Sequence, residues 1–381
     1  MILGETKELL DILRQNNQLL ITKSNHKRSW EYYHEQYHKA FCVLLEIAEQ
    51  RGYRTNCKFM PFLFLMRHSL ELFLKAKISN TPIPWEDYGK THNLTKLYEI
   101  ANINGENFLE FFGCLSCNSE GDCFRYLSDK AGKQYFDNGE RIFAYNACIY
   151  YFLFLDSNNL LTKYDKSKLL TWELTFHTTE CNTLGILGTQ YDFVIYDILV
   201  AIKDKQISIN DVYLPLLFLL RHCLEIKLKA AILALGDVVV KEDQDKVHST
   251  HSVRALYEIF NKPIDVAIKT IEDSEFKQES IRLQKETEQH KNAIQLLDDN
   301  SFLFRFPKDR RGNNANFVPK SNCVSEILDL YSKADSFLCF AVDVLSEAGV
   351  LEIGGDEESK YYERLFSLRA SSLECNLPLN Y

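Results

Sequence analysis

Two stretches of the chain decide its fold: residues 61–78 read PFLFLMRHSLELFLKAKI, and residues 215–232 read PLLFLLRHCLEIKLKAAI. They are identical at 12 of 18 positions at an offset of 154 residues, which chance does not produce. Self-similarity at a fixed offset is the signature of a repeated structural unit. The chain therefore contains one structural element twice.

Two further blocks follow in the same order in both halves. Residues 92–100 match residues 251–259 at five of nine positions, and residues 124–132 match residues 304–312 in their Phe, Arg, Asp and Gly. The offset grows to 159 and then to 180, so insertions separate the blocks, the largest being the charged stretch 273–300. We predict two homologous units, residues 1–165 and residues 166–381, with the border near Asp165.

Each unit is expected to be helical. Gly and Pro together number only 23 (15 and 8) in 381 residues, and few turn formers favour long helices. Apolar residues recur at helical spacing in 30–49 and 191–202, Pro61 and Pro215 are placed to begin central helices, and short third helices follow His92 and His251. The Phe-Arg-aromatic blocks are expected to be ordered loops, before fourth helices at 144–155 and 324–345. The predicted fold class is all-α, with two helical bundles in tandem and a helical insertion at 273–300, in a pseudo-twofold arrangement.

Composition limits the function and the compartment. The net charge of −9 excludes a general polyanion binder, so any nucleic-acid contact must come from a local patch. The longest apolar runs are far shorter than the roughly 20 residues that cross a bilayer. Eleven Cys at irregular spacing favour reduced thiols over a disulfide framework. We expect a cytoplasmic protein without a membrane-spanning segment.

A polar stripe runs along each otherwise apolar central helix. Arg67, His68, Glu71 and Lys75 fall within about 100° of one helix face, and the second copy repeats them as Arg221, His222, Glu225 and Lys229. A buried unpaired charge costs several kcal/mol, so these groups must pair with one another or face a cleft. Two interpretations follow: a buried ion-pair network that fixes helix register, or a polar pocket.

The pocket interpretation assigns a role to each residue. Arg offers a planar fork to phosphate oxygens, and His can move a proton near neutral pH. The candidate catalytic residues are His68, His222, Glu71 and Glu225, with His92 and His251 in support. The candidate phosphate-binding residues are Arg67, Arg221, Lys75, Lys229, Arg125, Lys130, Arg305, Arg310 and Arg311. A cleft that carries both stripes would favour this interpretation, whereas two separately buried stripes would favour the network.

The succession of an Arg-His-x-Leu-Glu-x-x-Leu-Lys-Ala helix and a His-x-Leu-x-x-Leu helix resembles HEPN domains, helical bundles of prokaryotic toxins and defence proteins. The resemblance covers residues 58–155 and 212–345. It implies RNA or nucleotide binding and, in many members, metal-independent RNA cleavage at an Arg-x(4–6)-His motif late in the domain. Here that spacing occurs only at Arg28 and His34, in the first helix. Two functions therefore remain: an RNA- or nucleotide-binding protein, with or without ribonuclease activity in stress or phage defence, and a non-catalytic protein-interaction scaffold.

One group of cysteines has the residue types of a metal site. Cys114, Cys117 and Cys123 supply three thiols, which His92 or Asp122 could complete. The chain has no second Cys-x-x-Cys pair nearby, and the other half has no equivalent group. We predict neither a metal nor a cofactor.

Overall fold

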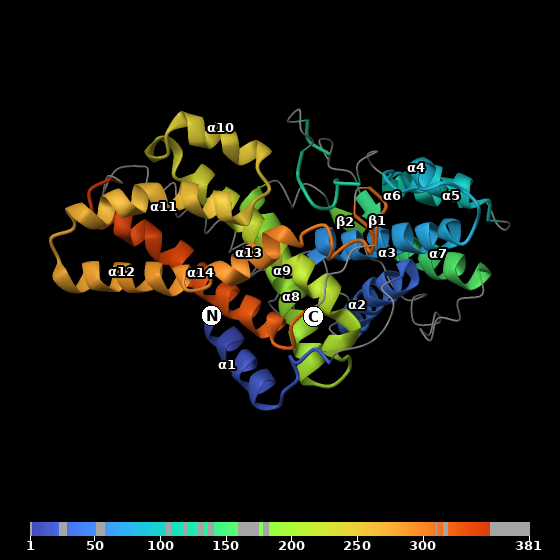
Figure 1. Cartoon of the computed structure of the whole chain (residues 1–381), viewed down its shortest axis with the longest axis horizontal. Coiled ribbons are helices and arrows are strands. Elements are labelled where there is room, and N and C mark those ends of the chain that lie inside the picture. Colours follow the sequence, from blue (N-terminus) through green and yellow to red (C-terminus); the bar gives the residue numbers. More distant parts are fainter. Residues whose placement is uncertain are drawn as a thin grey trace, which may run out of the picture.

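The computed structural model of the chain is chiefly helical (Figure 1). It describes residues 2–22, 29–50, 58–103, 108–116, 121–128, 133–135, 141–158, 175–177, 183–309, 311–314 and 319–350. The all-α prediction is confirmed. The unit border predicted near Asp165 lies outside the described residues.

The helices follow the order of the repeat blocks. The first half contributes α1 (Ile2–Gln15), α2 (Trp30–Gln50), α3 (Phe59–Ser79), α4 (Trp85–Tyr88), α5 (Leu94–Ala101), α6 (Leu109–Ser116), strand β1 (Arg141–Phe143) and α7 (Ala144–Ser157). The second half contributes strand β2 (Thr175–His177), α8 (Leu184–Lys203), α9 (Ile209–Ala234), α10 (Lys241–Ser249), α11 (Val253–Thr270), α12 (Ser274–Glu288), α13 (Lys291–Asp299) and α14 (Cys323–Glu347). β1 and β2 pair antiparallel, and in the described part of the chain they form the only sheet.

Matching capping residues begin the third helix of each half. Asn93 accepts a hydrogen bond from the Lys96 backbone N at 2.9 Å, and Ser252 accepts one from Ala255 at 3.1 Å. Each cap satisfies a backbone N–H that the first turn of a helix leaves without a partner. Both predicted third helices are confirmed, but α11 is not short, because it continues to Thr270.

The central helices of both halves pack together. α2 packs on α3 and α8 on α9, while α2 also contacts α9 and α3 contacts α8. Around this group, α4 to α7 lie on one side and α10 to α13 on the other (Figure 1). Phe64 of α3 and Phe218 of α9 stack at 4.8 Å between ring centroids, so the two halves share one core.

Two equivalent glutamines explain why one predicted helix start is wrong. The Gln190 side-chain oxygen accepts a hydrogen bond from Met60 N at 2.9 Å, directly before Pro61 near the start of α3. Gln36 accepts from Leu214 N at 3.0 Å and donates to Asn210 O, so its amide enters the backbone ladder of α9. Pro215 was expected to begin the helix, yet it lies inside α9. The inserted amide provides hydrogen bonds to the backbone N–H of Leu214 and the carbonyl of Asn210, where an internal proline disturbs the backbone ladder of the helix.

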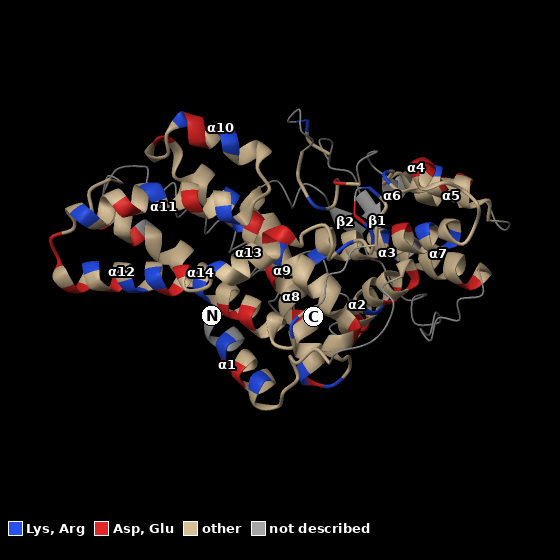
Figure 2. Cartoon of the chain, viewed as in Figure 1, with Lys and Arg blue, Asp and Glu red and all other residues tan. Residues whose placement is uncertain are grey.

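The charged stretch 273–300 is helical, as expected. It forms α12 and α13, and α12 packs along α14. Asp273 caps α12 by accepting a hydrogen bond from Phe276 N at 2.7 Å. Lys and Arg alternate with Asp and Glu along α10 and α12, which is typical of a solvated helix face (Figure 2).

Candidate functional site

The charged stripes form two clusters, one in each half of the chain. Cluster 1 is Arg67, Glu71 and Lys75 of α3 with His92. Cluster 2 is Arg221, Glu225 and Lys229 of α9 with His251. In each cluster, the glutamate is the shared partner of the other three side chains.

In cluster 1, the Glu71 carboxylate lies between three nitrogen groups. Its Oε2 is 3.3 Å from Arg67 Nη1, and its Oε1 is 3.0 Å from Lys75 Nζ and 2.8 Å from His92 Nδ1. Arg67 also donates to the Leu115 carbonyl at 3.2 Å, and Lys75 donates to the Gly89 carbonyl at 3.1 Å. Each cation thus has a further partner within the fold besides Glu71.

Cluster 2 repeats these contacts. Glu225 Oε2 is 2.7 Å from Arg221 Nη1, and its Oε1 is 3.2 Å from Lys229 Nζ and 2.8 Å from His251 Nδ1. A second carboxylate, that of Asp298, lies 3.7 Å from Arg221 Nη2. The sequence repeat therefore extends to the geometry of the ion pairs.

The two stripe histidines bond to backbone carbonyl oxygens. His68 Nε2 is 3.1 Å from Arg305 O, and His222 Nε2 is 2.9 Å from Arg125 O. A carbonyl oxygen only accepts, so each Nε2 carries the proton. The rings also stack on Phe64 and Phe218, at 5.4 and 5.5 Å between centroids. Both imidazoles are therefore held in place on two sides.

The Phe-Arg-aromatic blocks cross between the halves. We call residues 121–128 the first crossing loop and residues 301–309 the second. Tyr191 of α8 donates a hydrogen bond to Phe124 O in the first loop at 3.3 Å. Tyr37 of α2 donates to Phe304 O in the second at 3.1 Å. Each loop is thus held by a helix of the other half of the chain.

Tyr126 of the first crossing loop covers cluster 2. Its ring meets His222 edge-on, at 5.0 Å between centroids. Its hydroxyl lies 3.2 Å from Glu225 Oε1 and 3.1 Å from His251 Nδ1. A side chain from the first half therefore completes the carboxylate's hydrogen bonds in the second half.

Phe306 of the second crossing loop covers cluster 1 in the same way. Its ring centroid lies 5.1 Å from that of His68 and 5.5 Å from that of His92. Lys75 Nζ lies 4.9 Å from the Phe306 centroid, within the range of a cation–π contact. Gly312 follows with a φ of 86°, and an added Cβ would come within 2.8 Å of the Trp85 ring. Only glycine fits there without displacing a side chain of the first half.

Burial of the stripes is nearly complete. The four stripe residues of α3 are 0–2% exposed and those of α9 are 0–7% exposed. Burial lowers the pKa of both His68 and His222 to about 4. Because these values lie well below neutral pH, both imidazoles are neutral in the folded protein.

The two glutamates behave oppositely to isolated buried carboxylates. Burial by itself would raise the pKa of Glu71, but the Lys75 ammonium and His92 outweigh it, so the pKa lies well below its usual range. For Glu225, the hydrogen bond from His251 and the Arg221 guanidinium outweigh burial in the same way, so this pKa is also lowered. Both carboxylates are thus ionised and paired, as a structural ion-pair network requires.

The remaining candidate phosphate-binding residues have different surroundings. Arg125 pairs with Asp122 in the first crossing loop, whereas Arg311 is exposed. Arg305 lies in the second crossing loop, with its guanidinium carbon 5.5 Å from the Phe218 centroid. Lys130 and Arg310 lie outside the described residues.

Most of the cysteine group lies outside the described part of the chain. Cys123 is buried, while Cys117 and the side chain of Cys114 lie outside the description. Among the residues that the structure describes, no group of three or more His, Cys, Asp or Glu side chains is placed to hold a metal ion.

Sequence reasoning missed a second pair of equivalent clusters. In the second half, Lys227 lies 2.6 Å from both Asp192 and Asp335, and the Asp192 carboxylate also accepts from Tyr331. Burial raises the pKa of Asp192 to about 6. Lys227, a charged residue on an apolar helix, was the available signal.

The equivalent positions of the first half hold uncharged groups. Ser69 Oγ lies 2.9 Å from Tyr151 Oη, which lies 2.7 Å from His38 Nδ1. Burial lowers the pKa of His38 to about 3, so this imidazole is also neutral. The two halves therefore differ at this site, where the second half has an ion-pair network and the first half a neutral one.

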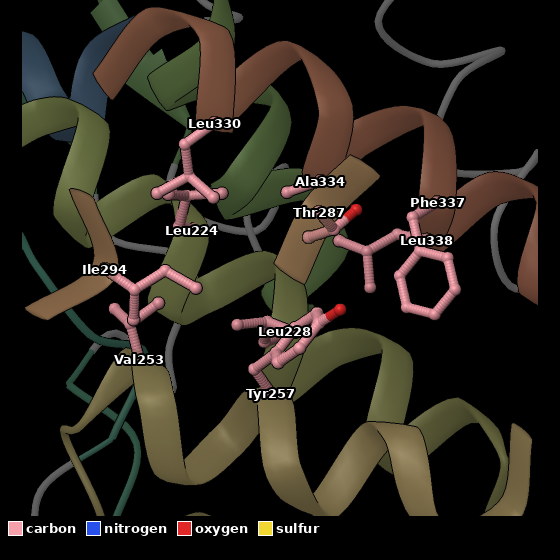
Figure 3. Close-up of a pocket in the computed structure, with 10 residues that line it drawn as sticks. All are labelled: Leu224, Leu228, Val253, Tyr257, Thr287, Ile294, Leu330, Ala334, Phe337 and Leu338. Atoms are coloured by element: carbon pink, nitrogen blue, oxygen red, sulfur yellow. The ribbon is translucent and has the colours of Figure 1, made fainter. Parts of the chain in front are cut away.

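A narrow crevice opens elsewhere, between α9, α11, α12, α13 and α14 (Figure 3). Its lining is apolar apart from the hydroxyl groups of Tyr257 and Thr287, and it has room for at most about one water molecule. None of the candidate site residues lines it. The crevice is therefore a packing defect of the second half rather than a ligand pocket.

Comparisons with family models, with curated proteins and with solved structures give no match. The HEPN resemblance thus rests on the quoted motifs alone. One described helix, α8, is long and apolar enough to cross a membrane, and 61% of its most apolar segment is buried inside the fold.

The buried histidines predict how stability depends on pH. Their pKa is about 4 in the folded chain against 6.5 for an unperturbed histidine, so between these values the unfolded chain binds more protons. The free energy of unfolding should therefore fall as the pH drops from 6.5 to 4. The lowered pKa values of Glu71 and Glu225 extend the loss below pH 4.5, their usual value. Urea titrations at stepped pH measure this.

The control is His248, whose side chain is exposed on α10. His248→Gln should keep the wild-type slope. A free energy of unfolding that stays constant between pH 6.5 and 4 would show that the stripe histidines are solvated.

Proposed function

We propose that this chain is a non-catalytic interaction scaffold with a HEPN-like fold, acting in the cytoplasm on a protein partner. The observation that carries the proposal is that each cluster is covered by the crossing loop of the other half, an arrangement that we call reciprocal closure. The first crossing loop covers cluster 2, and the second covers cluster 1. The stripe residues therefore make contacts that hold the two halves together. None of them is free to contact a substrate.

We further propose a pseudo-twofold relation between the two halves. Support comes from contacts that recur at the repeat offsets: the Gln36 and Gln190 caps, the Tyr37 and Tyr191 hydroxyls, and the Phe64–Phe218 stack. The crossing loops also share an isolated backbone bridge, Ser128 to Gln134 in one and Lys308 to Asn314 in the other. An axis through the aromatic stack would relate each of these pairs.

A metal-independent ribonuclease requires a different arrangement. Its histidine must reach the substrate and exchange a proton near neutral pH. His68 and His222 are at most 2% exposed and donate their Nε2 protons to backbone carbonyls. These features favour the scaffold over RNA cleavage by the stripes.

The test is incubation of the purified protein with total RNA in EDTA. We expect the RNA to remain intact, and we expect His222→Ala to lower the melting temperature, whereas His248→Ala leaves it unchanged. RNA cleavage by the wild type that is lost in a fully folded His222→Ala variant would contradict the scaffold proposal.

A further inference from the structure

Arg305 differs from the other arginines of the clusters and crossing loops. Arg67, Arg125 and Arg221 each lie within ion-pair distance of a carboxylate. Among the described residues, no carboxylate comes as near to Arg305, and its Nε, like that of Arg221, is buried without a hydrogen-bond partner. At the 180-residue offset, Phe302 occupies the position that Asp122 holds in the first crossing loop. The partner of the equivalent arginine has thus been replaced by an aromatic ring.

The Arg305 guanidinium lies beside the aromatic stack that joins the two halves. Its carbon is 5.5 Å from the centroid of Phe218, the ring that stacks on Phe64, and 5.3 Å from that of Phe306. Burial lowers the pKa of Arg305 to about 9, and repulsion by Arg125 adds to this effect. Each crossing loop thus carries one of two arginines that repel each other, and only Arg125 has a carboxylate partner.

The charges around Arg305 do not balance. Cluster 1 and Arg305 together contain the cations Arg67, Lys75 and Arg305 against the single carboxylate of Glu71. His68 adds no charge at neutral pH, because burial lowers its pKa to about 4. Among these four residues, the positive charges therefore exceed the negative ones by two.

Cluster 2 has no such excess of positive charge. Arg221 and Lys229 face Glu225, and Asp298 provides the second carboxylate. Arg125 above them is already paired with Asp122. The excess is therefore specific to the Arg305 side, although the repeat makes the two sides otherwise equivalent.

We propose that Arg305, with Arg125 beside it, binds a phosphate dianion, either inorganic phosphate or the terminal phosphate of a small ester. The Arg305 Nε is buried with neither a hydrogen-bond partner nor a carboxylate nearby, which is costly, and an anion of two charges matches the excess counted above. The planar guanidinium offers two parallel N–H donors to phosphate oxygens. This site is independent of the scaffold proposal, because a scaffold can hold a small anion at its centre.

The experiment compares thermal unfolding and calorimetric binding with and without inorganic phosphate. Phosphate should raise the melting temperature of the wild type, and Arg305→Gln should abolish that rise and weaken binding at least tenfold. In phosphate-free buffer, Arg305→Gln should melt no lower than the wild type, since it removes an uncompensated charge. The matched control is Arg311→Gln, an exposed arginine of the same segment, which should retain binding.

Two outcomes would overturn the proposal. One is a wild-type melting temperature that millimolar phosphate does not change. The other is a combination of two results: Arg305→Gln melts well below the wild type without phosphate, and it binds phosphate as tightly as the wild type. That combination would mean that Arg305 has a packing role only.

Further arms identify the source of the phosphate. Equal affinities for inorganic phosphate and a nucleoside monophosphate support recognition of the dianion alone. A higher affinity for the nucleoside monophosphate identifies a small ester as the ligand. An RNA oligonucleotide without a terminal phosphate offers only singly charged diesters. Binding of that RNA as tightly as inorganic phosphate would contradict the dianion proposal.

Discussion

Glu225→Ala is expected to lower the free energy of unfolding by about 3–5 kcal/mol, the usual cost of removing one partner from a buried ion pair. Glu225 is fully buried and accepts from or pairs with side chains of three different segments. Its removal leaves the Arg221 guanidinium and the Lys229 ammonium buried without their nearest carboxylate. Chemical denaturation followed by circular dichroism measures the loss.

The matched control is Glu279→Ala on α12. Glu279 is 43% exposed and pairs with Arg282, an exposed ion pair of the kind that contributes little to stability. Equal losses in the two variants would show that cluster 2 is solvated and would refute the network interpretation.

Phe306→Ala is expected to cost about 3–5 kcal/mol as well, because a buried phenylalanine loses both its transfer free energy and its packing. Phe306 is 2% exposed and touches His68, His92 and Lys75, all in the other half of the chain. The variant should also destabilise the first half locally. Amide hydrogen exchange should therefore accelerate in α3 and α5, although the substitution lies more than 200 residues away in sequence.

Tyr150→Ala is the control for an aromatic ring at the surface. Tyr150 is 46% exposed on α7, so its removal should cost much less. Faster exchange in α14 and α11, without change in α3 and α5, would place the Phe306 ring in its own half and contradict the crossing of the loops.

Much of the fold could be predicted from the repeat. The apolar runs with stripes of charge predict α3 and α9, and the i, i+4 spacing places Glu71 between Arg67 and Lys75, as the structure shows. Both residues after the third-block Phe, Arg125 and Arg305, could be recognised as equivalent. These features could be predicted from the sequence because each of them lies within a single helix or loop.

The crossing of the loops could not be predicted. An internal repeat shows that two blocks are equivalent, but it does not show whether each block packs in its own copy or in the other. The start of α9 before Pro215 was hidden for the same reason, because the side chain that satisfies its backbone is Gln36, in the other half of the chain. In both cases the deciding contact is distant in sequence.

A pair of double-mutant cycles tests the reciprocal closure most directly. Tyr126→Phe and Glu225→Gln should be coupled by about 1 kcal/mol in the free energy of unfolding, because the Tyr126 hydroxyl donates to this carboxylate from the other half of the chain. Tyr126→Phe and Glu71→Gln should be additive within about 0.5 kcal/mol, as expected for sites that share no partner. Coupling of Tyr126 to Glu71 in place of Glu225 would contradict the account.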